Sequence, residues 1–114
     1  MESCIELVEL YNPKINAVHH KLYDFAKDNL QKFSNGLFFG VPFLMKDLDS
    51  PIDGIPNSMG SEYLKNFKMP YNSSLAESFL KSGLKVVGKS ATPELGLMFT
   101  TEPKAFGPTR NPWD

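Results

Sequence analysis

The sequence feature that most constrains the fold is the apolar run Phe39-Gly-Val-Pro-Phe-Leu-Met-Lys-Asp-Leu48. Turn-forming residues enclose it, with Asn35-Gly36 before the run and Pro51, Gly54 and Pro56 after it. A short, continuous apolar run between turn residues is typical of a strand that is buried on both faces. We therefore predict a buried strand here, around which the other elements are arranged.

The predicted strand places Lys46 and Asp47 on opposite faces, because side chains alternate along a strand. Asp47 shares its face with Phe43 and Met45, and Lys46 shares its face with Leu44. A lysine inside an apolar layer must find hydrogen-bond partners or lose its proton, and a neutral lysine is a general base. Alternatively, Lys46 reaches solvent along its aliphatic stem, as most lysines do. The residues alone favour this second alternative.

Length and composition are those of one small domain, covering residues 1–114. The net charge of −1 gives no electrostatic reason to expect a nucleic acid or an anionic membrane as partner. No apolar stretch approaches the ~20 residues of a membrane span, and we expect no membrane association. The single cysteine, Cys4, fits a reducing cytoplasm, which is the location we expect.

Two helices are predicted before the organising strand. Ser3 and Glu6 form a capping-box pattern that opens the first, and Asn12-Pro13 is expected to end it. A connector over residues 13–18 leads to a second helix from about His20 to Phe33, which Asn35-Gly36 ends.

The residues after the organising strand predict a βαβ unit. A loop covers residues 49–60 and a short helix is expected over residues 59–67. Ser74 and Glu77 form a second capping-box pattern for a helix that closes at Gly83, and residues 84–88 read as a short buried strand. Two strands joined by such a crossover are expected to be parallel, which makes the fold class α/β.

The last segments show little periodicity. Thr92 is expected to cap one more helical turn, with Pro93 at its first position, and an open tail follows from residue 100.

Two motifs that suggest other functions do not have the required context. Residues 83–90 match the phosphate-loop pattern G-x-x-x-x-G-K-[ST], but a phosphate loop follows a strand and opens a helix, whereas here a helix comes first. His19 and His20 are neighbours that diverge on a helix and have no acidic or cysteine partners at ligand spacing, so we expect a solvated helix start and no metal site. No serine lies in a G-x-S-x-G elbow.

Five stretches give the sequence a resemblance to a known family. They follow one another in the family's order, at about its spacing, and cover nearly the whole chain: Leu10-Tyr-Asn-Pro-Lys-Ile-Asn-Ala-Val18, Phe39-Gly-Val-Pro-Phe-Leu-Met-Lys-Asp-Leu48, Gly54-Ile-Pro with Gly60-Ser, Val87-Gly-Lys-Ser-Ala-Thr-Pro-Glu-Leu-Gly96, and Phe106-Gly-Pro-Thr-Arg-Asn-Pro-Trp-Asp114. The chain resembles the N-terminal part of amidase signature hydrolases. It is most similar to bacterial amidases of the aminohexanoate cyclic-dimer hydrolase type, and it is less similar to the A subunits of transamidases.

The resemblance implies a Ser–cis-Ser–Lys mechanism for amide hydrolysis. The lysine of the family motif falls on Lys46, which would act as base for a bridging serine, and that serine would deprotonate the nucleophilic serine. Glu94, Leu95 and Gly96 would lie on the acyl-binding side. The family implies no metal and no organic cofactor, and a small-molecule amide as substrate.

The resemblance also implies that this chain is incomplete. In the family, a Gly-Gly-Ser-Ser-Gly-Gly-type segment that supplies the bridging serine follows the Asn-Pro-Trp motif, and residues 1–114 contain no such segment. We therefore expect a partial amidase-signature fold: N-terminal helices and a βαβ unit of a mixed sheet, incomplete at the C-terminus and inactive alone. A separate C-terminal amidase piece is the partner expected for a split enzyme. The alternatives are a non-catalytic remnant that binds a partner through its exposed sheet, or the N-terminal part of the A subunit of a glutamyl-tRNA amidotransferase.

Overall fold

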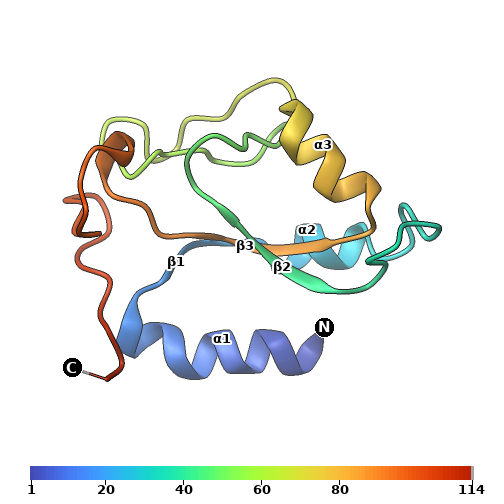
Figure 1. Cartoon of the computed structure of the whole chain (residues 1–114), viewed down its shortest axis with the longest axis horizontal. Coiled ribbons are helices and arrows are strands. Elements are labelled where there is room, and N and C mark those ends of the chain that lie inside the picture. The colour runs from blue at the N-terminus through green and yellow to red at the C-terminus, as the bar shows by residue number, and fades with distance from the viewer. Residues whose placement is uncertain (114) are drawn as a thin grey trace.

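A three-stranded sheet with helices on both faces forms the molecule (Figure 1). The structure, a computed structural model, describes residues 1–113. Its elements in chain order are α1 (Glu2–Ile15), β1 (Val18–Lys21), α2 (Tyr23–Asp28), β2 (Pro42–Lys46), α3 (Ser74–Lys81), β3 (Lys85–Ser90) and the 3₁₀ turn η1 (Glu94–Gly96).

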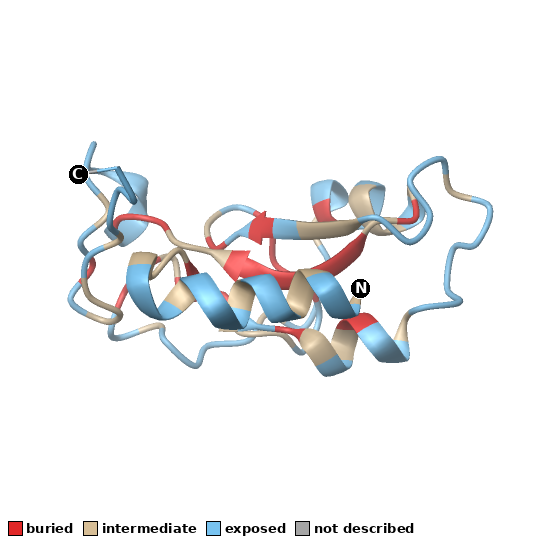
Figure 2. Cartoon of the chain, turned by 90° about the horizontal axis from the view of Figure 1, so that it is seen from below, coloured by how far each residue is buried: buried red, intermediate tan, exposed pale blue. Residues whose placement is uncertain are grey.

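Strand β3 is the centre of the sheet, in the order β1-β3-β2. It pairs with β2 in parallel and with β1 antiparallel, so the sheet is mixed. Five of its six residues are buried, and Figure 2 shows the buried residues concentrated along it. The predicted βαβ unit is therefore confirmed, with α3 in the crossover between β2 and β3.

The two faces of the sheet are covered unequally. On one face, α3 packs on β2 and β3, around a core of buried apolar residues: Leu22, Met45, Ile52, Ala76 and Val86. On the other face lies α1, which buries no residue completely and leaves an apolar hollow of about 220 Å³ beside Val18 and Leu44. The hydrophobic contribution to stability therefore comes chiefly from the α3 face.

Strand β2 is the predicted organising strand, but it is an edge strand and is not buried on both faces. Met45 is 1% exposed on the α3 face, whereas Leu44 is 37% exposed and Lys46 is exposed on the other. The predicted alternation is correct, since Asp47 is buried like Met45. The prediction of two buried faces was wrong because an apolar run alone does not show how many neighbours the strand has.

The region before β2 differs most from the sequence prediction. Helix α1 starts after Met1 without a side-chain cap, continues past Pro13 and ends at Ile15, followed by Asn16 in the left-handed conformation. His20 does not open a second helix: it lies in β1, whose pairing with β3 outweighs local helical periodicity. The expected helix from about His20 to Phe33 shrinks to α2, six residues long.

Three smaller predictions were also shifted or wrong. The residues after Met59 form turns instead of a short helix, and Tyr63 is 96% exposed. Helix α3 is capped by Ser73, one residue before the predicted cap, while its closure at Gly83 is confirmed by a φ of 94°. Strand β3 begins and ends slightly later than the predicted residues 84–88.

No helix within residues 1–113 combines the length and the hydropathy that crossing a bilayer would require.

Candidate active site

Lys46 is the last residue of β2 and lies where β3 also ends. Below, "this edge" means this end of the sheet, at the carboxyl ends of β2 and β3. It lies opposite Ser90 in the parallel register, and the backbone N–H of Asp47 donates to the carbonyl of Ser90 (3.1 Å). The side chain of Lys46 is exposed, and within residues 1–113 its ammonium makes no hydrogen bond or ion pair. The carboxyl ends of parallel strands are a common place for ligand sites in α/β folds.

Residues Glu94–Gly96 lie at the same edge, in the η1 turn that follows β3. The backbone N–H of Leu95 donates to the carbonyl of Met59 (2.7 Å). A Cβ on Gly96 would lie 3.0 Å from the side chain of Leu48, so this turn packs against the residue two positions after Lys46. The structure therefore brings the predicted base and the predicted substrate-side residues to one end of the sheet.

The turn itself differs in detail from the prediction. Pro93, rather than Thr92, occupies the cap position, and the hydroxyl of Thr92 is buried without a hydrogen-bond partner among the described residues. Beside Glu94 there is an open cavity of about 340 Å³, which is also lined by Met98, Thr100 and Glu102.

Asp47 is fully buried directly beneath this edge. Its carboxylate accepts hydrogen bonds from the backbone N–H of Ser58 (3.0 Å) and from the hydroxyl of Ser58. The Nε2 atom of His20 lies 3.3 Å from Asp47 Oδ2. Burial raises the pKa of Asp47, but His20, Ser58 and the ammonium of Lys89 together outweigh burial and hold the pKa below its usual value.

Lys89 is the second fully buried charged residue of this cluster. Its ammonium donates to the carbonyl of Ser50 (3.1 Å) and to the side-chain oxygen of Asn57, and it lies 3.8 Å from Asp47 Oδ1. Burial lowers the pKa of Lys89 to about 8, although Asp47 acts in the opposite direction. Lys89 belongs to the rejected phosphate-loop match, and its place in a strand agrees with that rejection.

The two histidines are not at a solvated helix start, in contrast to the prediction from the sequence. Both lie in β1. The ring of His19 stacks on Phe106 with a centroid distance of 4.1 Å, and burial lowers the pKa of His19. Because His20 approaches Asp47, the site contains a His–Asp–Lys cluster in which Asp47 and Lys89 are fully buried and His20 is partly exposed. Its members come from β1, the residue after β2, and β3.

Sequence reasoning missed this cluster because it depends on three strands far apart in the chain. The alternation argument placed Asp47 correctly away from Lys46, and that was the one available signal that the carboxylate needed another partner. Lys89 could have been found by the same argument, since a lysine in a strand of buried valines needs an acceptor. His20 gave no signal, because β1 was not predicted.

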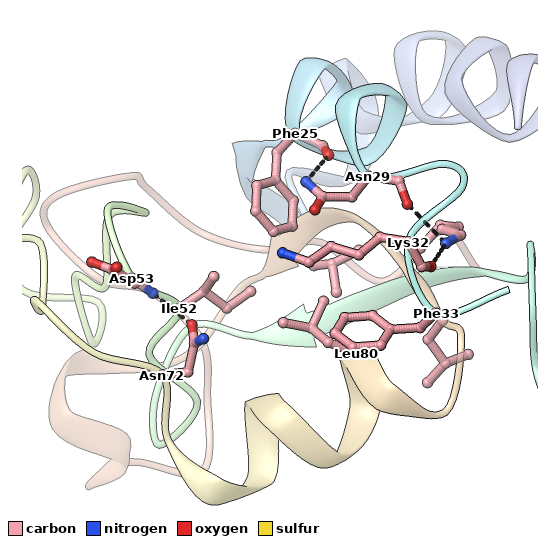
Figure 3. A pocket seen from close by; sticks show the side chains of 11 residues that line it. Phe25, Asn29, Lys32, Phe33, Ile52, Asp53, Asn72 and Leu80 are labelled. Carbon is pink, nitrogen blue, oxygen red and sulfur yellow. Dashed lines mark hydrogen bonds between the residues drawn. The ribbon is translucent and has the colours of Figure 1, made fainter. Parts of the chain in front are cut away.

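A third cavity, of about 200 Å³, is drawn in Figure 3; it borders Lys85, at the opposite end of the β2–β3 pair from Lys46. Phe25, Ile52 and Leu80 line it, and the side chain of Lys32 extends into it. Lys85 at the start of β3 borders this cavity, while Lys46 lies level with the end of β3, so the cavity is separate from the candidate site.

Within residues 1–113, no group of three or more His, Cys, Asp or Glu side chains is arranged to hold a metal ion.

The amidase family profile matches residues 1–114. The chain belongs to the amidase family. The 6-aminohexanoate-cyclic-dimer hydrolase of Paenarthrobacter ureafaciens is 35% identical over 116 residues, covering 100% of this chain and 23% of the relative. A solved structure of 6-aminohexanoate cyclic dimer hydrolase with substrate superimposes with a TM-score of 0.93 and 36% identity, covering 99% of this chain and 24% of that one. The α/β fold predicted for a partial amidase is thereby confirmed.

The A subunit of glutamyl-tRNA(Gln) amidotransferase from Thermoanaerobacter pseudethanolicus is also 35% identical, over 99% of this chain and 24% of the relative. Sequence identity therefore does not separate the two kinds of amidase-family relative. The chain spans about a quarter of the length of these relatives.

Proposed function

We propose that this chain is the N-terminal part of a single amidase domain that hydrolyses carboxylic amide C–N bonds, with Lys46 as the base. The observation that carries the proposal is the position of Lys46. This exposed residue ends β2 beside the η1 turn, and its ammonium has no partner among the described residues. A base must be able to reach its substrate proton, and the buried Lys89 cannot.

In the proposed reaction, neutral Lys46 takes the proton of a bridging serine hydroxyl. The bridging serine takes the proton of the nucleophilic serine, whose oxygen attacks the amide carbonyl. The amine leaves with a proton, and water then hydrolyses the acyl-enzyme ester. The bridging serine would come from a Gly/Ser-rich segment of the kind that residues 1–114 do not contain, and the nucleophilic serine would follow shortly after that segment. We therefore expect these residues alone to be inactive, with a C-terminal amidase segment as the partner that completes the site.

Glu94, Leu95 and Gly96 are proposed to lie beside the acyl part of the substrate. The contacts of η1 with Met59 and Leu48 support this proposal, because they hold the turn at the edge where Lys46 ends its strand. The proposed reaction uses no metal or organic cofactor. We retain a cytoplasmic location as part of this proposal, on the basis of the single Cys4.

The second candidate function is that of the A subunit of an amidotransferase. It is favoured by the 35% identity to the glutamyl-tRNA(Gln) amidotransferase relative over nearly the whole chain. In that case the chain would act within an assembly of several proteins. A non-catalytic interaction piece is the remaining alternative, and it would use the uncovered face of β2 around Leu44.

The experiment is a chimera in which this chain replaces the matching quarter of the P. ureafaciens cyclic-dimer hydrolase. We expect the chimera to hydrolyse the cyclic dimer. Lys46→Ala and Lys46→Arg should each lower kcat at least about a hundredfold, since alanine removes the base and arginine stays protonated. Lys27→Ala, at an exposed position of α2, is the matched control and should leave kcat unchanged.

A folded chimera whose kcat is unchanged by Lys46→Ala would contradict the proposed role. Measurable amide hydrolysis by the unfused 114-residue chain would contradict the expected dependence on a C-terminal segment. A second chimera would place this chain in the amidotransferase relative from T. pseudethanolicus. Activity of that chimera on glutamine or glutamyl-tRNA, with no activity of the first chimera on the cyclic dimer, would favour the second candidate.

A further inference from the structure

The ammonium of Lys89 connects β3 to the short segment that directly follows Lys46, residues 47–50. It donates directly to Ser50, and it lies 3.8 Å from the carboxylate of Asp47. It also donates to the side-chain oxygen of Asn57, whose nitrogen donates to the carbonyl of Leu48 (2.9 Å). Of the four residues after Lys46, Lys89 thus contacts Asp47 and Ser50 directly. It holds Leu48 through the side-chain amide of Asn57.

The same contacts extend to the η1 turn. Asp47 holds Ser58 through two hydrogen bonds, and the hydroxyl of Ser58 accepts from the backbone N–H of Gly60 (3.2 Å). A Cβ on Gly60, which has a φ of 71°, would lie 2.7 Å from the carbonyl of Thr92, so this loop touches the segment that leads into η1. Met59, between Ser58 and Gly60, accepts the hydrogen bond from Leu95.

We propose that Lys89 is a positioning residue for the reaction proposed for Lys46, because its buried ammonium sets the relative placement of Lys46 and the η1 turn. Lys89 touches neither the substrate nor the reacting atoms in this account. This inference rests on the proposed function, since it assigns a role within the same reaction. Catalytic groups must be held to within a fraction of an ångström of their working geometry, and a displacement of about 1 Å can cost about a hundredfold in rate.

Lys85 provides a matched control on the same strand. It is also buried, at 3% exposure, and its ammonium donates to two backbone carbonyls, those of Asn29 (2.9 Å) and Lys32 (2.8 Å). These partners follow α2 and lie beside the start of β3, whereas Lys46 lies level with its end. Replacing either lysine by methionine removes a buried ammonium from β3, but only Lys89→Met disconnects the segment after Lys46.

The first measurement is amide hydrogen exchange on the 114-residue chain, which reports local opening without requiring activity. In Lys89→Met we expect the amides of Ser58 and Leu95 to exchange about tenfold faster or more, while that of Phe38, bonded to the carbonyl of Ser82, keeps its rate. Lys85→Met should leave Ser58 and Leu95 unchanged. Equal acceleration at all three amides in both variants would overturn the proposal, because it would reduce Lys89 to general stabilisation.

The second measurement is the split between kcat and KM in the hydrolase chimera. Lys89→Met should lower kcat by about tenfold or more with KM little changed, whereas Lys85→Met should keep both. Asn57→Ala, which leaves the Lys89–Asp47 pair in place but breaks the connection to Leu48, should give the same loss and serves if Lys89→Met does not fold. Unchanged kcat in the folded Asn57→Ala chimera overturns the positioning role. An inactive unmutated chimera overturns the proposed function instead, and the exchange result then decides whether Lys89 holds this edge together.

Discussion

Three lysines of the sheet show how the surroundings of one residue type determine its role. Lys85 is bound by backbone carbonyls, Lys89 is bound by a carboxylate and two further oxygens, and Lys46 is exposed without a partner among the described residues. A lowered pKa in a cleft is often a sign of a functional group. Here burial lowers the pKa of both Lys85 and Lys89, and both side chains are closed off from solvent. Access to solvent therefore decides the candidate base, and it favours Lys46.

Asp47 leads to a prediction about acid stability. Asp47→Asn should lower the free energy of unfolding by about 3–5 kcal/mol at pH 7, because it leaves the ammonium of Lys89 buried without a countercharge. The pKa of Asp47 is lowered from 3.8 in the fold, so its stabilisation is present above that value and is lost as pH falls through the lower, folded pKa. Urea unfolding at pH 7 and below pH 4 should show the difference between the two proteins shrinking in acid. Asp53→Asn, at an exposed position, is the control; an equal loss there would contradict the account.

Lys89 leads to a prediction about stability at alkaline pH. Its pKa falls from 10.5 to about 8 on folding, so between these values the unfolded chain binds more protons than the folded one. Stability should therefore rise with pH across this window as far as Lys89 is concerned. Urea unfolding at pH 7.5, 9 and 10 should show a smaller rise in Lys89→Met than in the unmutated protein. Lys27→Met should keep the full rise, and an unchanged slope in Lys89→Met would show that Lys89 does not titrate in this way.

At the scale of elements, the sequence predicted the helices and strands that local residue patterns determine. It missed those that depend on pairing between distant strands. The strand–helix–strand unit from Pro42 to Ser90 was predicted because its apolar runs and turn residues are strong local signals. Strand β1 was missed because His19, His20 and Lys21 resemble a polar helix start, and only the antiparallel pairing with β3 makes them a strand. For the same reason, β2 was expected to be buried on both faces although it lies at an edge of the sheet.

The cap of α3 lies one residue earlier in the structure than the sequence predicted. The side chain of Ser73, not that of Ser74, accepts a hydrogen bond from the backbone N–H of Ala76 (3.1 Å). Ser73→Ala should lower the free energy of unfolding by about 1 kcal/mol, and Ser74→Ala should change it by less than about 0.5 kcal/mol. Chemical unfolding of both variants measures this difference, and the reverse order would restore the cap position predicted from the sequence.

At the scale of the whole molecule, the candidate site combines residues from both ends of the chain. Resemblance to the family predicted Lys46 and Glu94–Gly96 as site residues, and the structure brings these residues to one end of the sheet. The His20–Asp47–Lys89 cluster beneath them could not be predicted, because it requires the register of three strands. The apolar side chains left exposed around this frame include Leu44 on β2 and Leu7 on α1. These are the surfaces on which a C-terminal amidase segment would pack in the proposed enzyme.

In the proposed enzyme, Lys46 activates a serine that lies outside residues 1–114. The most direct test is covalent labelling with a fluorophosphonate, in which a serine oxygen bonds to phosphorus and fluoride leaves with the serine proton, followed by intact-protein mass spectrometry. We predict that the 114-residue chain is not labelled, that the hydrolase chimera gains one adduct, and that Lys46→Ala slows the labelling of the chimera at least about a hundredfold. Labelling of the isolated chain, or equal labelling rates with and without Lys46, would contradict the account.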